Sequence, residues 1–140
     1  MAEETSSPVV GALRVLVVTP EGRAFEGLAA GVVVPGWDGE VAFLPGHAAY
    51  VGAVGEGLLR VLPLEGDEGR WYLEGGVVQV LDGEVTVLAE RVTPTGDLDL
   101  EAAARDLEAA LAVVPSTDEA FAERDRAVRS ARARLRVGRS

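Results

Sequence analysis

"VVVPGWDGEVAFLPGHAAYVGAVGEGLLRV", residues 32–61, alternates short β-rich runs with turns that contain glycine or proline. The pairs Pro35-Gly36 and Pro45-Gly46 each end a run of apolar residues, and both dipeptides are typical of turns. A helix does not tolerate so many breaks in so short a stretch. This stretch therefore predicts strands that are joined by tight turns.

The same pattern continues on both sides of this stretch. Further β-rich runs occupy residues 13–18, 70–74, 77–81 and 84–90. Asp82-Gly83 separates two of them, which is a strong signal for a hairpin, and Gly75-Gly76 reads as another turn. Fourteen of the seventeen glycines lie between Gly22 and Gly83, where turns need positive φ. We expect residues 13–92 to form an all-β sandwich of about ten short strands, preceded by a disordered extension at 1–12.

The periodicity changes to that of a helix in residues 93–140. One apolar stripe at helical spacing comprises Leu100, Ala103, Leu107, Leu111 and Val114. Pro115 ends this helix, and Ser116 with Glu119 fits a capping box for a second helix at about 118–137.

The second helix has its own apolar stripe, which comprises Phe121, Ala127, Val128, Ala131 and Leu135. Two amphipathic helices with a short connection predict an antiparallel helical hairpin, so the fold class is α+β. The seam between the helices is rich in alanine and only one stripe wide. We therefore expect the hairpin to be held weakly.

Composition excludes several classes of function. The chain has no cysteine, so disulfides and thiolate metal sites are ruled out. All thirteen basic residues are arginine, and the net charge of −10 argues against nucleic-acid binding. No apolar run is long enough to cross a membrane, and the acidic N-terminus is neither a secretory signal nor a transit peptide. We expect no direct membrane insertion and a cytosolic compartment.

No set of residues indicates an active site. His47 is the only histidine, and no serine lies in a context typical of a nucleophile. Scattered carboxylates with one histidine have no metal-ligand spacing. The sequence thus predicts no catalytic residues, no metal and no cofactor. Trp37, at the tip of a turn between Gly36 and Asp38, is instead a candidate contact residue.

Read together, these turns resemble the signature of the epsilon subunit of F-type ATP synthases. The stretch at 32–61 is similar to the family's Pro-Gly-x-x-Gly-Glu turn followed by Leu-Pro-Gly-His-Ala. "LEGGVVQVLDGEVTVLAE" (73–90) resembles its Ser-Gly-Gly strand pair, and "ARLRV" (133–137) its C-terminal helix end. Two departures are Ala49 in place of the usual proline and Glu74 where many members have serine.

The resemblance implies a mechanical function. Members of the family are non-catalytic rotor subunits that bind the gamma subunit and the c-ring, on the cytoplasmic face of the bacterial cell membrane as peripheral proteins. His47 then belongs to a structural corner, and Glu40 matches an acidic turn position that faces the c-ring. Trp37, Glu40 and His47 are the candidate rotor contacts. The coupling ion, H⁺ or Na⁺, does not follow from this chain.

The resemblance also bears on nucleotide binding. Some members bind ATP through a motif of Leu-Asp, two residues, then Arg-Ala at the start of the first helix. Here the motif is degenerate: Leu98, Asp99 and Ala103 match, but Ala102 replaces the arginine. A methyl group offers no contact to phosphate, so we expect weak or absent ATP binding.

The basic C-terminus suggests a regulatory surface. Residues 118–140 carry seven arginines against four acids, and Arg129, Arg132 and Arg136 share one helical face. In the family this hairpin extends along gamma, and its basic face meets the catalytic alpha and beta subunits and inhibits ATP hydrolysis. From the residues alone, the alternative is that these three arginines are only exposed to solvent and bind no partner. A free-standing β-sandwich adaptor with a helical dimerisation arm, or a hydrolase that uses His47, also remains open at this stage.

Overall fold

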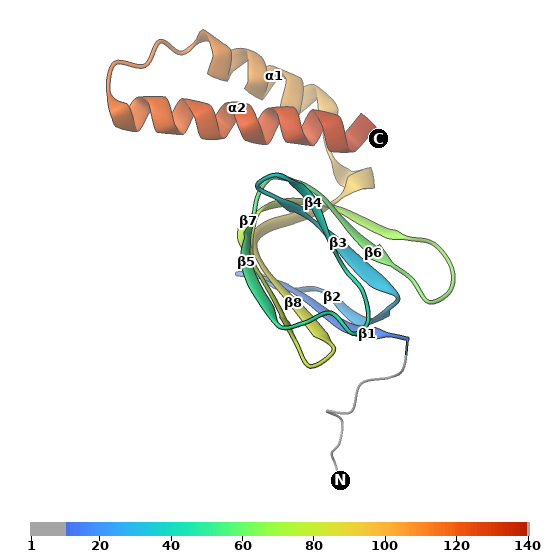
Figure 1. Cartoon of the computed structure of the whole chain (residues 1–140). Coiled ribbons are helices and arrows are strands. Elements are labelled where there is room, and N and C mark those ends of the chain that lie inside the picture. The colour runs from blue at the N-terminus through green and yellow to red at the C-terminus, as the bar shows by residue number, and fades with distance from the viewer. Residues whose placement is uncertain (1–10, 140) are drawn as a thin grey trace.

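The predicted α+β class is confirmed, with strands first and helices last (Figure 1). The computed structural model describes residues 11–139, so the disorder predicted for the N-terminal extension falls almost entirely outside the described residues. Ala12, the last residue of that extension, is buried. The strands are β1 (Leu13–Thr19), β2 (Gly22–Ala29), β3 (Gly31–Gly36), β4 (Gly39–Phe43), β5 (Tyr50–Val54), β6 (Gly57–Leu62), β7 (Gly69–Leu81) and β8 (Glu84–Pro94). A short 3₁₀ turn, Thr95–Asp97, leads to α1 (Leu100–Ala112) and α2 (Asp118–Arg139).

The eight strands form one folded sheet in the order β2-β1-β8-β7-β6-β3-β4, with β5 paired to β7 outside this path. Neighbouring strands are antiparallel except for β1 and β8, which are parallel in the register Arg14↔Glu84. The order leaves β2 and β4 at its two ends, so the sheet does not close. β4 is therefore an edge strand of the β domain.

Residues 11–139 contain eight strands where the sequence predicts about ten, and one reason is that Gly75-Gly76 is not a turn. Residues 69–81 form the single long strand β7. Its first part pairs with β6 as far as Leu73, and its second part pairs with β5 from Gly76 onward. Both glycines have positive φ, and a Cβ on Gly76 would collide with the backbone of Leu88. The two glycines thus form a corner at which β7 changes its neighbour.

Alternation along the strands produces one apolar core inside the β domain. Its members are mostly β-branched, which suits a pleated surface, and they include Val15, Val17, Val32, Val34, Phe43, Leu59, Leu73, Val78, Val80, Val85 and Val87. Trp71 packs against this core and meets the ring of Phe25 edge-on at 5.5 Å. Tyr72, the next residue of β7, faces the opposite side and is fully buried beneath the helices.

The helical seam differs from the predicted one near the tip of the hairpin. Ala103, Ala110, Val128, Ala131 and Leu135 are buried. In contrast, Leu111, Val114, Phe121 and Ala127 are exposed. Because α1 ends at Ala112, Val114 lies in the connection rather than on the stripe, and the two helices have no third layer to cover their outer residues.

The start of α2 also differs by one residue from the prediction. Thr117, not Ser116, provides the cap: its Oγ1 accepts a hydrogen bond from the backbone N–H of Ala120 at 3.0 Å. The predicted capping box between Ser116 and Glu119 is therefore wrong. Two adjacent hydroxyl residues were available, and only the position of the first helical turn decides between them.

The hairpin lies across one end of the β domain, opposite the start of β1 (Figure 1). Within the β domain, α2 contacts mainly β6 and β7. This arrangement brings the last turns of the chain onto the first half of β7. It creates the interface at which the candidate functional residues gather.

Candidate functional site

The interface between the hairpin and the β domain has a small apolar centre. Tyr72, Ala133 and Val137 form a buried cluster that is separate from the core of the β domain. Leu58 of β6 and Leu98, which precedes α1, pack against it. Burying so few side chains provides a modest hydrophobic stabilisation, which is consistent with the weakly held hairpin that the sequence predicts.

A polar cluster borders this apolar centre. Glu74 Oε2 accepts hydrogen bonds from the Tyr72 hydroxyl at 2.6 Å and from the Ser130 hydroxyl at 2.7 Å. The two hydroxyl oxygens lie 3.3 Å apart. Tyr72 and Glu74 share a face of β7 because they are two residues apart, whereas Ser130 belongs to α2. One carboxylate oxygen therefore joins the β domain to the last helix.

The environment keeps Glu74 ionised and Tyr72 neutral. Burial acts to raise the pKa of Glu74, but the hydrogen bonds from Tyr72 and Ser130, with the charges of Arg91 and Arg134, outweigh burial and lower it. Burial, followed by the hydrogen bond to Glu74, raises the pKa of Tyr72 well above its usual range. The phenol therefore remains a donor, and the carboxylate an acceptor, at neutral pH.

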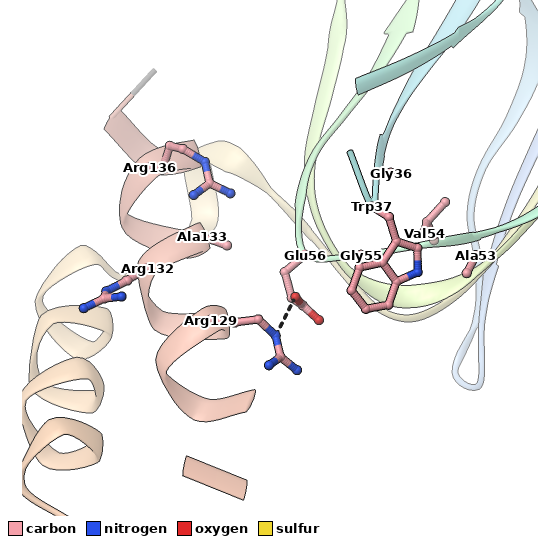
Figure 2. A pocket seen from close by; sticks show the side chains of 10 residues that line it. All are labelled: Gly36, Trp37, Ala53, Val54, Gly55, Glu56, Arg129, Arg132, Ala133 and Arg136. Carbon is pink, nitrogen blue, oxygen red and sulfur yellow. Dashed lines mark ion pairs between the residues drawn. The ribbon is translucent and has the colours of Figure 1, made fainter. Parts of the chain in front are cut away.

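A groove of about 490 Å³ opens beside this cluster, between α2 and the turns of the β domain (Figure 2). Trp37, Val54, Gly55 and Glu56 line one side, and the predicted arginine face lines the other. Trp37 is 91% exposed, as expected for a residue at the tip of a turn. The groove therefore exposes an aromatic ring opposite guanidinium groups.

The structure places Arg129, Arg132 and Arg136 along this groove. Arg129 Nε lies 3.5 Å from Glu56 Oε1, and Figure 2 shows this pair bridging α2 to the β domain. Arg132 extends away from the β domain in the same view. All three side chains are exposed, so they remain accessible to a partner.

The residues of the degenerate ATP motif have structural roles here. Asp99 caps α1, because its Oδ1 accepts a hydrogen bond from the backbone N–H of Ala102 at 3.0 Å. Leu98 packs in the interface cluster, and Ala103 is fully buried. Arg105, one turn further along, is exposed. Helix capping and packing thus account for every matching position of the motif.

Trp37, Glu40 and His47 are spread along the edge strand β4 rather than gathered in one site. Trp37 precedes β4, Glu40 lies in its exposed first half, and His47 follows the strand at its far end. The His47 ring packs edge-on against Phe43 at 5.0 Å, and its backbone N–H donates to Leu44 O. His47 Nδ1 lies 2.8 Å from Ala48 O. These contacts give His47 a local role in shaping the corner.

Sequence reasoning missed an ion cluster between β6 and β7. Glu68 accepts two hydrogen bonds from Arg60, both at 3.0 Å, and one from Arg70 at 2.8 Å. These hydrogen bonds lower the pKa of Glu68 to about 2. The register Arg60↔Arg70 brings the two arginines side by side, where a carboxylate offsets their repulsion. The acidic residue Glu68 between the basic residues Arg60 and Arg70 was the sequence signal from which this cluster could have been predicted.

Within residues 11–139, no group of three potential ligands is close enough to hold a metal ion. Over the same residues, neither helix is long and apolar enough to cross a membrane. The arrangement offers contact surfaces: an aromatic tip, an edge strand, and a basic helix face next to a small docking interface. Glu56, Glu74 and Ser130 were not predicted as site residues.

Comparison with known proteins finds a family model that matches the β domain, and it finds relatives that match most of the chain. Residues 12–95 match the family model of the ATP synthase delta/epsilon chain β-sandwich domain. An ATP synthase epsilon chain of Rhodopirellula baltica is 39% identical over 127 residues, which cover 91% of this chain and 98% of that protein. An ATP synthase epsilon chain of Maricaulis maris is 38% identical over 112 residues, which cover 79% and 82%.

Solved structures agree on the fold. A chain in the mitochondrial ATP synthase of Euglena gracilis, solved with OSCP, F1 and c-ring in rotational state 1, superposes with a TM-score of 0.83 at 20% identity. The match covers 100% of this chain and 88% of that one. A chain of the central stalk and c-ring of Tetrahymena thermophila mitochondrial ATP synthase has a TM-score of 0.72 at 14% identity, with 90% and 96% covered. Taken with the family model and the full-length relatives, these matches show that the chain belongs to the ATP synthase delta/epsilon chain family.

Proposed function

We propose that this chain is a non-catalytic rotor subunit of the central stalk of a bacterial F-type ATP synthase. It binds the gamma subunit and the c-ring and helps to transmit rotation between the ring and the catalytic head. Two observations support a mechanical function: the relatives that match over most of its length are ATP synthase epsilon chains, and its exposed features are contact surfaces. As part of that complex, it is a peripheral protein at the cytoplasmic face of the cell membrane.

The edge strand β4 is the proposed contact with the c-ring. Trp37, Glu40 and His47 follow one another along this edge, so a partner that touches all three runs parallel to β4. Glu40 is exposed and offers a carboxylate to basic loop residues of the ring.

A charge reversal at this edge tests the contact. In the assembled enzyme, we expect Glu40→Arg to weaken ring binding and to lower ATP-driven ion pumping relative to hydrolysis. Glu84→Arg, at the exposed start of β8, is the matched control. Full coupling and unchanged retention of the ring in the Glu40→Arg enzyme would contradict the contact.

The hairpin is the proposed regulatory part. Docked on the β domain, it permits rotation; extended along gamma, it presents the arginine face to the alpha and beta subunits and inhibits hydrolysis. The observation that carries this proposal is the small interface, Tyr72, Ala133 and Val137, beside three exposed arginines. A switch needs two states that differ by only a few kcal/mol, and an interface of this size is compatible with that requirement.

Removal of the hairpin tests the regulation. Deletion of residues 98–140 leaves the core of the β domain intact, because that core is a separate cluster from the interface residues. We expect such an enzyme to assemble and synthesise ATP nearly normally and to hydrolyse ATP faster. An unchanged rate of hydrolysis at matched assembly would refute inhibition by the hairpin.

A further inference from the structure

Glu74 is the residue at which β7 reaches the last helix. It lies directly before the Gly75-Gly76 corner, so the bend of β7 begins immediately after its carboxylate. Tyr72, on the same face of the strand, is fully buried, whereas Glu74 and Ser130 are half-buried. In this position a carboxylate is partly withdrawn from water, and its hydrogen bonds are stronger than those of an exposed pair.

The cluster continues from Ser130 into the rest of the hairpin. Arg134, one turn beyond Ser130, forms an ion pair with Asp106 of α1 at 3.0 Å. Its Nε donates to the backbone carbonyl of Ser130 at 3.4 Å. The charge of Arg134 also favours the ionised form of Glu74. Both helices are therefore linked to one carboxylate of the β domain.

We propose that Glu74, held by Tyr72 and bound by Ser130, is a latch that sets the equilibrium between the docked and the undocked hairpin. Of the two hydrogen bonds that Glu74 accepts, the one from Ser130 crosses the interface, since Tyr72 and Glu74 belong to the same strand and stay together when α2 leaves. Undocking thus breaks a charge-assisted hydrogen bond and exposes the apolar face of Tyr72. The latch gives a role to Glu74, at which this sequence departs from the Ser-Gly-Gly pattern.

The Arg129–Glu56 pair is a second link across the interface, but it is a weaker one. The Arg129 side chain is 58% exposed, so water and salt screen the pair. Its main effect is to keep part of the arginine face occupied while the hairpin is docked. The latch at Glu74 does not depend on it.

Thiol protection on the isolated full-length chain measures the docking equilibrium. Because the native chain has no cysteine, Ala133→Cys introduces a single thiol at a site that is 1% exposed and packs on Tyr72. A thiol reagent labels this site only after undocking, and Arg126→Cys, on the exposed surface of α2, gives the unprotected rate. The ratio of the two rates reports the docked population even when undocking is rare.

In the Ala133→Cys background, we expect Ser130→Ala to raise the labelling rate about tenfold, as for the loss of a hydrogen bond to a charged group. Alanine favours the helix, so α2 itself is not weakened. Glu74→Ala should raise the rate at least as much, and the double variant should label no faster than Glu74→Ala alone. Ser116→Ala and Glu84→Gln are the matched controls and should not change the rate.

Two results would overturn the latch: an unchanged labelling rate in the Ser130→Ala protein, or additive effects of the two substitutions. The near-ultraviolet circular dichroism of Trp71 verifies that the β domain remains folded in every variant.

The regulatory consequence rests on the proposed function and has a separate test. In the assembled enzyme, Ser130→Ala should lower ATP hydrolysis, because more hairpins are free to extend. Faster labelling with unchanged hydrolysis would support the latch and refute inhibition by the hairpin. Unchanged labelling would refute the latch whatever the rate of hydrolysis.

Discussion

Replacement of the arginine face by alanine should activate ATP hydrolysis without unfolding the hairpin. The perturbation is the triple variant Arg129→Ala, Arg132→Ala and Arg136→Ala. All three side chains are exposed, and alanine has the highest helix propensity, so α2 should remain helical. Among residues 11–139, the only cross-interface ion pair that the change removes is Arg129–Glu56 at 3.5 Å.

The expected magnitude follows from comparing the two states. In the docked state, the loss of an exposed pair costs less than about 1 kcal/mol. In the extended state, three arginine contacts with acidic loops contribute about 1 kcal/mol each, or about 3 kcal/mol together. The net change of about 2 kcal/mol favours the docked state, which shifts the ratio of inhibited to active enzyme about 30-fold. Hydrolysis then rises to nearly the rate of the enzyme that lacks residues 98–140.

The assay is steady-state ATP hydrolysis by assembled membrane enzyme at fixed ionic strength, normalised to the amount of this chain in the complex. A control variant removes the same charge elsewhere, at exposed positions Arg14, Arg105 and Arg126. We expect the control to hydrolyse ATP at the parental rate. Equal rates in the parent and the arginine-face variant would refute the reasoning, as would equal activation in the control.

The remaining predictions concern ATP binding and the stability of the fold at low pH. Calorimetry of the isolated chain should detect weak or no ATP binding, because Ala102 stands where the motif has arginine; micromolar affinity would contradict this. Glu68, with its pKa lowered to about 2 by hydrogen bonds from Arg60 and Arg70, should stabilise the fold above the usual carboxyl pKa and lose that contribution as the pH falls through about 2. The difference in denaturation midpoint between the parent and Glu68→Gln should therefore be constant near neutral pH and vanish near pH 2. A difference that persists in acid would indicate an effect other than the ionised carboxylate.

The glycine- and proline-containing turn motifs made the fold class predictable. They did not determine whether a given motif joins two strands or bends a single strand. Asp82-Gly83 lies between β7 and β8 as expected, because a tight turn is encoded by the residues within it. Pro35-Gly36 instead ends β3, and the turn to β4 follows at Trp37-Asp38. Gly75-Gly76 carries the same local signal, yet it forms a corner inside one strand. The difference depends on which strands pair on either side, and that is a non-local property.

The candidate site could be predicted from the sequence only where its residues lie on a single helix or strand. The arginine face follows from helical spacing along α2 alone. Its pair with Glu56, and the bond between Glu74 and Ser130, join residues far apart in the sequence. They depend on the angle at which the hairpin docks, and a one-dimensional pattern does not contain that angle. Glu74 was visible only as a departure from the family pattern.

The parallel pairing of β1 with β8 imposes an order of events during synthesis. β1 finds this partner only when residues 84–88 have been made, about 70 residues after Arg14. At about 5–20 residues per second, the nascent chain waits several seconds with one edge of β1 unpaired. Until then β2 is its only neighbour, joined to it by a short turn. The β domain should therefore complete its fold late and cooperatively on the ribosome, and a chain that stalls before β8 should be a preferred target for chaperones and proteases.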